Sequence, residues 1–451
     1  MKGVISSPPH PPHLLILQLS SAPMKPIDVM VLGAGGRGTF AYAPYARSHP
    51  EALNITAIAE PDADRRARFA AMYEIEPERQ FASWEEALGA GQLARAAINC
   101  TMDRMHVAST VAALNVGYDV LLEKPMAVTP QECRLLVDTA EKLGRTLQIC
   151  HVLRYTDFFN KLYEIVNSGR LGDIVTIDHR ENVSYWHMSH SFVRGNWGNE
   201  ALSAPMILAK CCHDMDILVW LMQQRVKRLS SFGSLQHYRA EKAPVAAPLR
   251  CTDGCPIADS CIWYAPKLYG AVEGQYETGS GFMINAMNGS DKTPRERFEL
   301  LKTSPYGRCV YHCDNDVVDH QVINMEFEKG VTCTFTMHGH SDREGRSMRW
   351  DGTRATLYGD FYDEQEIRIH DHGSDKVEVI PIGGKATQGS GHGGGDGGII
   401  RDFIAALNGQ TSTRQTTARV SLESHLMCFA AEESRRTGQT IDMSTWRTSD
   451  R

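Results

Sequence analysis

Lys124 and His213 are two residues of this 451-residue chain whose types suit proton transfer and the stabilisation of negative charge. The oxidation of an alcohol, for example, needs a base for the hydroxyl proton and a cation beside the developing alkoxide. Histidine is the usual base because its pKa lies near neutral pH, and Lys124 offers an ammonium group within the sequence Glu123-Lys124-Pro125. We expect His213 to act as base or acid and Lys124 to stabilise the alkoxide, with Lys210 as a further catalytic candidate.

The segment 206–220 contains this histidine and predicts an amphipathic helix. Lys210, His213 and Asp214 stand at positions i, i+3 and i+4, so they share one helical face. A buried group of this kind needs polar partners or a ligand. The alternative to a catalytic group is a structural cluster whose members satisfy one another.

A glycine-rich loop near the N-terminus has the pattern G-x-G-x-x-G. It follows the apolar run 27–32, which predicts a buried parallel strand, and it opens a helix. The first glycine permits the turn, the second lets the backbone approach a pyrophosphate, and the third allows close helix–strand packing. The residues expected to hold a dinucleotide here are Gly33, Gly35, Gly36, Arg37 and Gly38.

Glu60 ends the next predicted strand, 55–59, about 20 residues after this loop. A carboxylate at this place accepts hydrogen bonds from the adenosine ribose and repels a 2′-phosphate. NAD is therefore favoured over NADP, although Arg65 and Arg66 reduce that preference. The alternative is a surface glutamate without a ligand.

Strands and helices alternate through residues 25–150, which predicts a doubly wound parallel sheet, that is, an NAD-binding Rossmann domain. The expected strands are 27–32, 55–59, 96–100, 119–122 and 147–150, and the expected helices are 63–73, 106–116 and 130–143. The ligand of such a sheet lies at the carboxyl ends of the strands. Further cofactor-binding candidates at those ends are Thr101, His106, Glu123 and Lys124.

The second half of the chain alternates apolar and polar residues, as strands with one covered face do. A hairpin is expected from 322–327 and 331–337, and other strands from 174–183, 355–358, 367–370 and 377–380. Thr332, Thr334 and Thr336 share one face, which makes it a candidate oligomer surface. Residues 151–445 are therefore expected to form an α+β domain.

Together these motifs resemble the Gfo/Idh/MocA oxidoreductases. The residues that carry the resemblance are the glycine loop, Thr101, His106, Glu123-Lys124-Pro125, His151-x-x-Arg154-Tyr155 and the segment 167–174. The resemblance implies a Rossmann domain, then a domain with a largely antiparallel open-faced sheet. It also implies NAD(P), secondary alcohols of sugars and cyclitols as substrates, and dimers or tetramers that pair through the open sheet.

One position departs from the family pattern. The resemblance implies an Asp four residues before the catalytic His, and this chain has Ala209 there, followed by Lys210. The usual Asp–His–Lys arrangement is thus altered, and Lys210 is the candidate replacement for the lost polar group.

Two further segments are rich in groups that bind sugars. Residues 185–197 hold Trp186, His187, His190 and Arg194, for which the alternative is a packed interdomain loop. Residues 389–398 form a glycine-rich loop in which His392 could approach the nicotinamide, as in related NAD-dependent glycosidases. The alternative there is a connector with Asp396 as N-cap. The resemblance adds Arg154 and Tyr155 to the substrate candidates.

Twelve cysteines are an unusual number, and five of them fall in an insertion-like stretch, 245–315. In a reducing compartment, closely spaced thiols suggest a bound metal, either Zn²⁺ or an iron–sulfur cluster. The expected ligands are Cys251, Cys255, Cys261 and Cys309, with Cys313 or His312 as substitutes for the fourth. Unrelated free thiols and a disulfide are the alternatives.

Composition limits the class of protein. The net charge is −7 and no long basic run occurs, which argues against a nucleic-acid partner. No apolar run is long enough to span a membrane. Residues 1–24 contain prolines and a short apolar stretch, so they predict a disordered extension rather than a signal peptide. Without a signal peptide, we expect a cytoplasmic protein.

Three functions fit this sequence. The first is an NAD-dependent dehydrogenase acting on a sugar, glycoside or cyclitol, as a homo-oligomer. The second is an NAD-dependent glycoside hydrolase that works through transient oxidation and elimination. The third is an NAD sensor without catalysis, against which the retained Lys124 and His213 argue.

Overall fold

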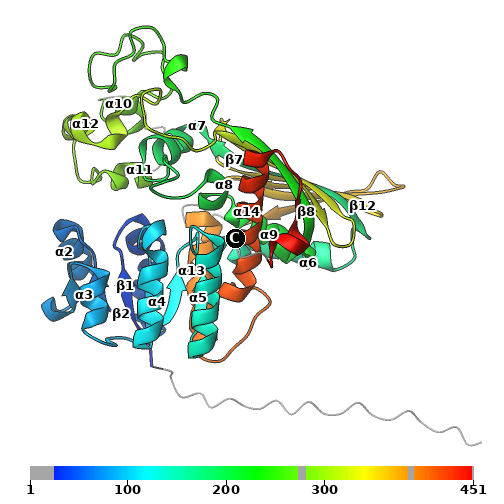
Figure 1. Cartoon of the computed structure of the whole chain (residues 1–451), viewed down its shortest axis with the longest axis horizontal. Coiled ribbons are helices and arrows are strands. Elements are labelled where there is room, and N and C mark those ends of the chain that lie inside the picture. The colour runs from blue at the N-terminus through cyan, green and yellow to red at the C-terminus, as the bar shows by residue number, and fades with distance from the viewer. Residues whose placement is uncertain (1–24, 273–280, 384–390, 449–451) are drawn as a thin grey trace, which may run out of the picture.

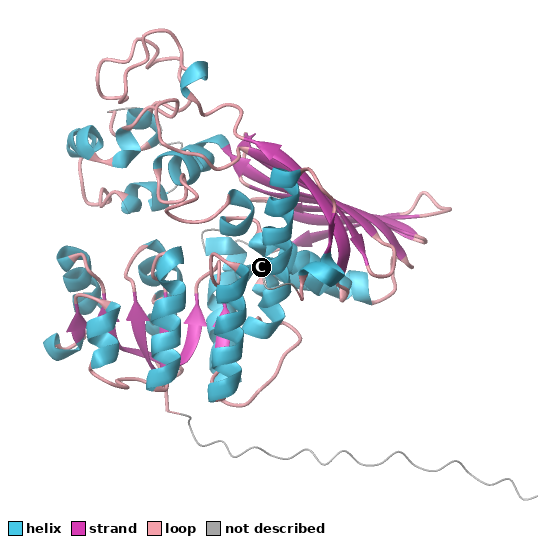
Figure 2. Cartoon of the chain, in the orientation of Figure 1, coloured by secondary structure: helices cyan, strands magenta, loops and turns pink. Residues whose placement is uncertain are grey.

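Two β-sheets organise the chain in the computed structural model, which describes residues 25–272, 281–383 and 391–448 (Figure 1). The predicted extension 1–24 lies outside the described residues. The first sheet belongs to the N-terminal domain and the second fans out beside it (Figure 2). A smaller lobe of short helices projects from the second domain above the first sheet.

The first sheet has six parallel strands in the order β3-β2-β1-β4-β5-β6. Its strands are β1 (Ile27–Leu32), β2 (Leu53–Ala59), β3 (Gln80–Phe81), β4 (Ala96–Asn99), β5 (Asp119–Leu122) and β6 (Leu147–Ile149). Its helices are α1 (Pro44–Ser48), α2 (Ala63–Met72), α3 (Trp84–Gly89), α4 (His106–Val116) and α5 (Pro130–Leu143). The order reverses between β1 and β4, so the doubly wound sheet is confirmed.

Local sequence explains these boundaries well. In α5, the Thr129 side chain accepts the N–H of Glu132, Pro130 occupies the first turn, and Gly144 ends the helix in the left-handed conformation. In β1, five of six residues are buried because helices cover both faces of the sheet.

The second sheet has nine strands in the order β14-β13-β12-β11-β7-β10-β9-β8-β15. Its strands are β7 (Ile174–Ser184), β8 (Val226–Ser234), β9 (His320–Phe327), β10 (Thr332–Ser341), β11 (Gly345–Gly352), β12 (Ala355–Phe361), β13 (Gln365–Asp371), β14 (Val377–Ile382) and β15 (Ile441–Asp442). Neighbours are antiparallel except β7 and β10, which run parallel. The predicted antiparallel sheet is confirmed, while β8, β11 and β15 had not been predicted.

Helices cover one face of this sheet. They include α6 (Asp157–Asn167), α9 (Cys212–Met222), α14 (Ala418–Thr437) and the short α15 (Met443–Trp446). Cys333, Phe335 and Met337 of β10 point into this core, whereas Thr332 is exposed on the other face. Figure 2 shows that face without helices over the part of the chain that the structure describes.

The chain returns to the first domain after the second sheet. Helix α13 (Gly395–Leu407) packs with Ile399, Ile400 and Phe403 into the core around β1 and β2. Residue Thr417 then pairs with Gln148 beside β6. The two domains therefore share a packed boundary, at which the carboxyl ends of the first sheet face the second domain (Figure 1).

The predicted helix 206–220 is interrupted. Helix α8 (Met206–Ala209) ends at Lys210, and α9 begins at Cys212. The insertion forms its own lobe with α10 (Ala265–Leu268), α11 (Gly281–Ala286) and α12 (Pro294–Thr303), next to the short α7 (Tyr185–His187). The remaining short elements are two π-helical stretches, 37–42 and 188–194, and 3₁₀ turns at 77–79, 103–105, 152–155, 240–242, 305–307 and 391–394.

Candidate active site

The glycine loop has the shape that a dinucleotide phosphate needs. Gly33 has φ +93, and a Cβ there would lie 2.6 Å from the carbonyl oxygen of Cys100. A Cβ on Gly38 would lie 2.2 Å from the carbonyl oxygen of Gly33, so only glycine fits the strand–helix contact. By contrast, Cβ atoms on Gly35 and Gly36 would meet nothing within 4 Å. The backbone is thus open where a pyrophosphate would approach, and the residues fit NAD(P).

Glu60 lies at the carboxyl end of β2 with its carboxylate turned toward this loop. Oε2 accepts the N–H of Ala34 at 2.8 Å, and Oε1 accepts the N–H of Asp62 at 3.0 Å. Each carboxylate oxygen has a second acceptor position for a ribose hydroxyl. Arg65 also lies 3.4 Å from Oε1, and Arg66 donates to the Glu60 carbonyl oxygen.

Lys124 reaches from β5 to the second domain. Its Nζ donates a hydrogen bond of 2.8 Å to the carbonyl oxygen of Ala209, the last residue of α8. This carbonyl is available because the helix is broken between Ala209 and Cys212. The break therefore positions the ammonium group beside Ala209, the position at which the family resemblance implies an Asp.

His213 lies on the first turn of α9 and is buried. Burial, followed by the charge of Lys124, lowers its pKa well below the usual value. Its Nδ1 has no hydrogen-bond partner among the described residues. The imidazole is therefore neutral near pH 7 and carries a buried polar atom that is not used by the fold.

Two other histidines flank His213. The ring of His151 lies 5.6 Å away and that of His392 lies 6.0 Å away, measured between centroids. His392 is the outermost, with 37% of its side chain exposed, and its Nδ1 lies 3.2 Å from Asp396. The structure thus brings the glycine-rich loop before α13 to the predicted catalytic helix.

Arg37 joins the glycine loop to the same region. Its guanidinium pairs with Glu123 at 2.6 Å and with Asp396 at 2.7 Å, and it donates to the hydroxyl of Tyr42. Glu123 also accepts the Tyr42 hydroxyl and the N–H of Lys124. Burial raises the pKa of Glu123, but Arg37 and Lys124 more than offset this, so the carboxylate stays ionised. The network holds the Rossmann loop, β5 and α13 together.

Lys210 points away from this network to two carboxylates. Its Nζ lies 2.9 Å from Oε1 of Glu344 and 3.4 Å from Oε1 of Glu181. Burial lowers the pKa of Lys210, but these carboxylates outweigh it and the pKa lies above the usual value. Asp214 pairs instead with Arg346 at 2.7 Å and with His179 at 2.8 Å. Lys210 and Asp214 thus belong to one ion-pair cluster, joined through Glu181 and Arg346, whereas His213 of the predicted shared face is not among its ion pairs.

Several predicted ligand residues have internal partners. His106 bridges the carbonyl oxygens of Pro125 and Thr101, and Thr101 donates to Asn99. Arg154 is buried in a bidentate pair with Asp216, with both distances 2.7 Å. These groups fix the positions of the strand ends and of the segment after β6.

Tyr155 and two residues of the 185–197 segment also pack inside the protein. The Tyr155 hydroxyl donates to Asp402 of α13. His190 contacts the hydroxyl of Tyr269 at 2.7 Å, and buried Arg194 donates to two backbone carbonyls of the insertion lobe. For His190 and Arg194, these contacts agree with the alternative that residues 185–197 form a packed interdomain loop.

Trp186 and His187 lie nearer to the predicted catalytic residues. Their rings stack with centroids 5.8 Å apart, and His187 Nδ1 lies 2.9 Å from Oε1 of Glu344. Glu344 also contacts Lys210, so His187 reaches the end of α8 through this carboxylate.

The predicted metal site is not supported. Across residues 25–272, 281–383 and 391–448, no group of three or more His, Cys, Asp or Glu is arranged to hold a metal ion. Cys251, Cys255, Cys261 and Cys309 are free thiols, as are the other eight cysteines. The lobe is ordered by a small apolar core of its own and by Arg194, which lies 3.7 Å from the Cys251 sulfur. Packing therefore provides the order that we had attributed to a metal.

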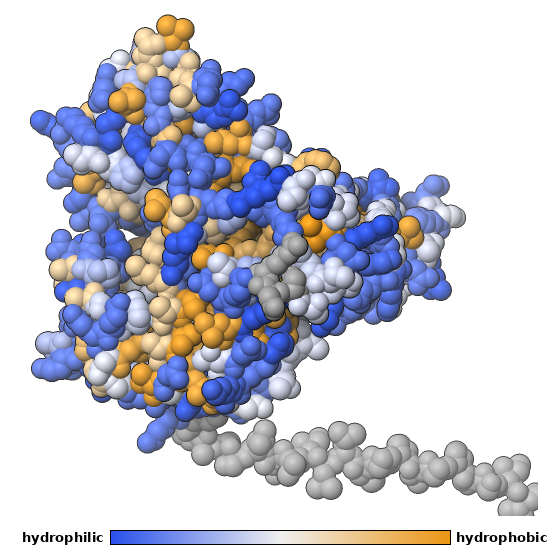
Figure 3. Space-filling view, in the orientation of Figure 1, coloured by the Kyte–Doolittle hydropathy of each residue, from blue (hydrophilic) through white to orange (hydrophobic). Residues whose placement is uncertain are grey.

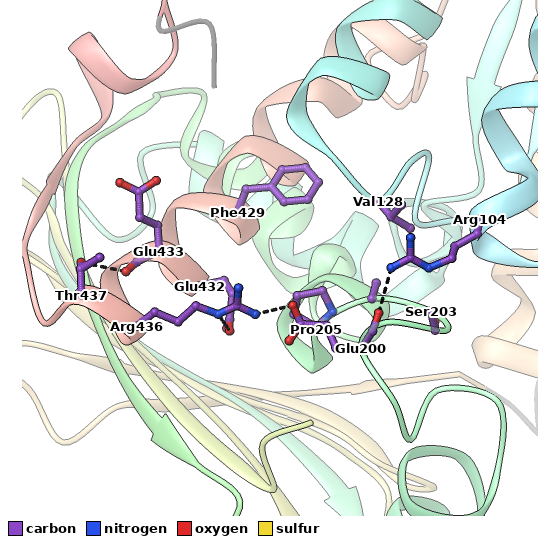
Figure 4. A pocket seen from close by; sticks show the side chains of 11 residues that line it. Arg104, Val128, Glu200, Ser203, Pro205, Phe429, Glu432, Glu433, Arg436 and Thr437 are labelled. Carbon is purple, nitrogen blue, oxygen red and sulfur yellow. Dashed lines mark hydrogen bonds and ion pairs between the residues drawn. The ribbon is translucent and has the colours of Figure 1, made fainter. Parts of the chain in front are cut away.

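A separate cavity of about 360 Å³ lies between the Rossmann domain, the loop before α8 and the end of α14 (Figure 4). Arg104 donates to the carbonyl oxygen of Glu200 there, and Arg436 pairs with the Glu200 carboxylate. None of the predicted catalytic residues lines it. Elsewhere the surface is hollowed between the Rossmann domain and the insertion lobe (Figure 3). None of the described helices could cross a membrane.

Five residues of the site were not predicted from the sequence. They are His151, Glu181, Glu344, Arg346 and, as a partner of Arg37, Asp396. His151 belongs to the motif His151-x-x-Arg154-Tyr155, so the sequence could have indicated it. Glu181 and Arg346 lie on buried strand positions where a charged residue is rare, so alternation along β7 and β11 could have singled them out.

Comparison with known proteins agrees with this architecture. Residues 27–151 match the oxidoreductase family with an NAD-binding Rossmann fold, and residues 164–443 match its C-terminal alpha/beta domain. The Bacillus subtilis protein YteT is 21% identical over 316 residues, which are 67% of this chain and 70% of YteT. Inositol 2-dehydrogenase of Corynebacterium glutamicum is 28% identical over 204 residues, 45% of this chain and 56% of that enzyme.

The fold also matches a solved structure, aldose-aldose oxidoreductase from Caulobacter crescentus in complex with glycerol. The TM-score is 0.65 with 15% identity, covering 93% of this chain and all of that one (100%). The glycine loop, the two sheets and the matches to both family domains lead to one conclusion: this chain belongs to the Gfo/Idh/MocA family of NAD(P)-dependent oxidoreductases.

Proposed function

We propose that this protein is an NAD-dependent dehydrogenase that moves hydride between a secondary alcohol of a sugar, glycoside or cyclitol and the nicotinamide. The observation that carries the proposal is the placement of Lys124 and His213 at the carboxyl edge of the Rossmann sheet. Lys124 donates to Ala209, four residues before His213, and its charge, after burial, lowers the pKa of His213. The inositol and aldose activities in the names of related proteins agree with this substrate class. NAD, when bound, supplies the hydride acceptor.

The protein's own residues provide the acid–base chemistry. Neutral His213 accepts the hydroxyl proton of the alcohol. The Lys124 ammonium stabilises the negative charge that develops on the substrate oxygen. Because a charged imidazole beside Lys124 is disfavoured, the proton then passes outward to His392 and solvent.

The cofactor preference follows from Glu60. Its carboxylate remains able to accept ribose hydroxyls and would repel a 2′-phosphate, which supports NAD over NADP. Arg65 is already paired with Glu60 and Asp62, so it is less available to a phosphate than the sequence suggested. A strong preference for NADP would contradict this part of the proposal.

A homo-oligomer is part of the proposal. The helix-free face of the second sheet carries the threonines of β10, of which Thr332 bonds to Thr176 of β7 at 2.9 Å. A surface of β-branched side chains suits pairing with a second copy.

The second candidate is an NAD-dependent glycoside hydrolase. The position of His392, 6.0 Å from His213, favours it, because oxidation followed by elimination requires a second base for a carbon-bound proton. The hydride returns at the end, so no net reduction of NAD results.

One experiment separates these functions. The purified protein is incubated with NAD and a panel of polyols, sugars and aryl glycosides, and NADH and released sugar are both measured. Accumulated NADH supports the dehydrogenase. Released sugar without net NADH supports the hydrolase. Bound NAD with neither product contradicts both and leaves the non-catalytic sensor.

A further inference from the structure

The carboxylate of Glu344 ties together two residues beside the proposed catalytic pair. Oε1 lies 2.9 Å from Lys210 Nζ and 2.9 Å from His187 Nδ1. Oε2 accepts the N–H and the hydroxyl of Ser184 at 2.9 and 3.0 Å. One oxygen is thus used to hold the backbone, while the other joins an ammonium and an imidazole.

These three groups form the solvent-facing edge of a larger buried cluster. The exposed fractions of the side chains are 15% for Lys210, 18% for His187 and 31% for Glu344. Behind them, Glu181 and Asp214 have side chains that are 0% exposed. Solvent, and therefore a polar ligand, reaches only the outer three.

The outer groups border the proposed catalytic site. Lys210 directly follows Ala209, whose carbonyl oxygen holds Lys124. His187 is joined to Lys210 through Glu344, so both lie beside the residue that holds Lys124.

The cluster has no surplus positive charge. Two cations, Lys210 and Arg346, face three carboxylates, those of Glu181, Asp214 and Glu344. Glu181 is fully buried, with its Oε2 2.5 Å from the Arg346 guanidinium and its Oε1 3.4 Å from Lys210. Burial raises its pKa to about 7 despite Arg346 and Lys210.

On the Rossmann side of the site, positive charge is likewise matched by carboxylates. There, Arg37 is paired with the carboxylates of Glu123 and Asp396. Lys124 is the remaining cation, and the proposed function assigns it to the reacting oxygen. A substrate carboxylate would thus lose its hydration next to existing carboxylates without gaining a free cation.

We propose that Lys210, positioned by Glu344 and bordered by His187, binds a hydroxyl group of an uncharged polyol or glycoside, and that this cluster selects against sugars that carry a carboxylate. The acceptor positions of Glu344 are taken by Lys210, His187 and Ser184, so the substrate oxygen accepts an N–H of Lys210 while Glu344 holds the ammonium in place. This inference rests on the proposed function for the location of the reacting carbon. It also turns Lys210 from a catalytic candidate into a substrate-binding residue, since an ammonium held between two carboxylates is a poor proton carrier.

The test measures sugar binding to the NAD-loaded protein by saturation-transfer NMR, independently of turnover. The probes are myo-inositol, D-glucose and methyl β-D-glucoside, with D-glucuronate as the charged counterpart of glucose. The variants are Glu344→Gln and Lys210→Met. Their matched controls change exposed ion pairs elsewhere, namely Glu326→Gln on β9 and Lys161→Met on α6.

At least one neutral probe is expected to bind the wild type more tightly than glucuronate, and its affinity to fall tenfold or more in both variants. NAD affinity and both controls should stay within twofold of wild type. Because Glu344 also holds Ser184, Lys210→Arg provides a second variant, which should recover part of the affinity. If turnover is measured as well, the KM should rise while kcat changes by less than threefold.

Several outcomes would overturn the inference. They are no binding of any neutral probe, tighter binding of glucuronate than of glucose, or unchanged affinity in both variants. Binding that follows the expected pattern without any turnover or sugar release would instead leave the inference standing and remove the proposed function. The two failures are therefore distinguishable.

Discussion

The Nζ of Lys124 lies 2.8 Å from the carbonyl oxygen of Ala209, which joins the end of β5 to the break between α8 and α9. A carbonyl carries only a partial negative charge, so it orients the ammonium without neutralising it. A carboxylate at the same place would form an ion pair with Lys124. The substitution of Ala209 for the Asp that the resemblance implied therefore leaves Lys124 as a full positive charge beside the proposed reacting oxygen.

Replacing Lys124 by Met should lower kcat by roughly 100- to 1000-fold, because the developing alkoxide loses its cation. Steady-state kinetics on the best substrate of the panel measures this, and fluorescence titration measures NAD affinity. Lys142→Met, on the exposed surface of α5, is the matched control and should leave kcat unchanged. Turnover of the Lys124 variant within twofold of wild type would contradict the assignment.

The pH dependence should reflect the lowered pKa of His213. A base with the ordinary histidine pKa of about 6.5 would lose about three-quarters of its activity at pH 6. Burial and then Lys124 lower the pKa of His213, so its neutral form persists and kcat/KM should stay flat as the pH falls from 8 to 6. His370→Gln, on an exposed position of β13, controls for unrelated histidines. If kcat/KM were half-maximal near pH 6.5 in both the wild type and the His370 variant, that result would count against this role of His213.

Two glycines of the loop should respond differently to alanine. Gly35→Ala meets no atom within 4 Å, so the protein should fold normally and lose about tenfold or more in NAD affinity, because the methyl group occupies the pyrophosphate's approach. Gly38→Ala places a Cβ against the carbonyl of Gly33 and should lower the free energy of unfolding by about 2–4 kcal/mol. Thermal unfolding and NAD titration separate the two effects.

The control for this pair is Gly89→Ala in α3, where an added Cβ also meets nothing within 4 Å. It should fold normally and keep its NAD affinity. Equal loss of NAD affinity in the Gly35 and Gly89 variants would remove the phosphate role of the loop.

The stability of the second domain should depend on Glu181. Burial raises its pKa to about 7, above the value of about 4.5 for an exposed glutamate. A raised carboxyl pKa means that the folded state holds a proton that the unfolded state releases, so stability is greatest below pH 4.5 and falls as the pH rises through 7. In Glu181→Gln this fall, on the order of 1–3 kcal/mol, should disappear.

Urea unfolding at pH 5.5 and 8.5 measures this difference. Glu326→Gln, which changes a partly exposed carboxylate of β9, should keep the wild-type pH dependence. A pH dependence in Glu181→Gln equal to that of the wild type would show that another group is responsible.

Much of the first domain could be predicted because its signals are local. The apolar run of β1, the caps of α5 and the glycine loop each depend on a few neighbouring residues. The helix 106–116 and the strand 119–122 were predicted with the boundaries that the structure shows. Alternation along β10 likewise predicted which face is buried.

The differences from the sequence-based expectations concern contacts between residues far apart in the chain. Arg194 carries a charge that suggested sugar binding, yet it donates to backbone carbonyls of the insertion lobe. The cysteine spacing suggested a metal, but a small apolar core orders that lobe instead. Spacing along a sequence limits which groups can meet, and the packing of the whole lobe decides whether their side chains converge.

The sequence by itself determined the family, the two sheets and the residue types available for hydride transfer, since periodicity and short motifs are properties of neighbouring residues. Only the tertiary structure decided the partners: Lys124 with Ala209, Lys210 with Glu344, and His392 with His213. These pairs join residues that lie 85, 134 and 179 positions apart in the chain, so local spacing cannot set their distances and only the packing of the whole chain does.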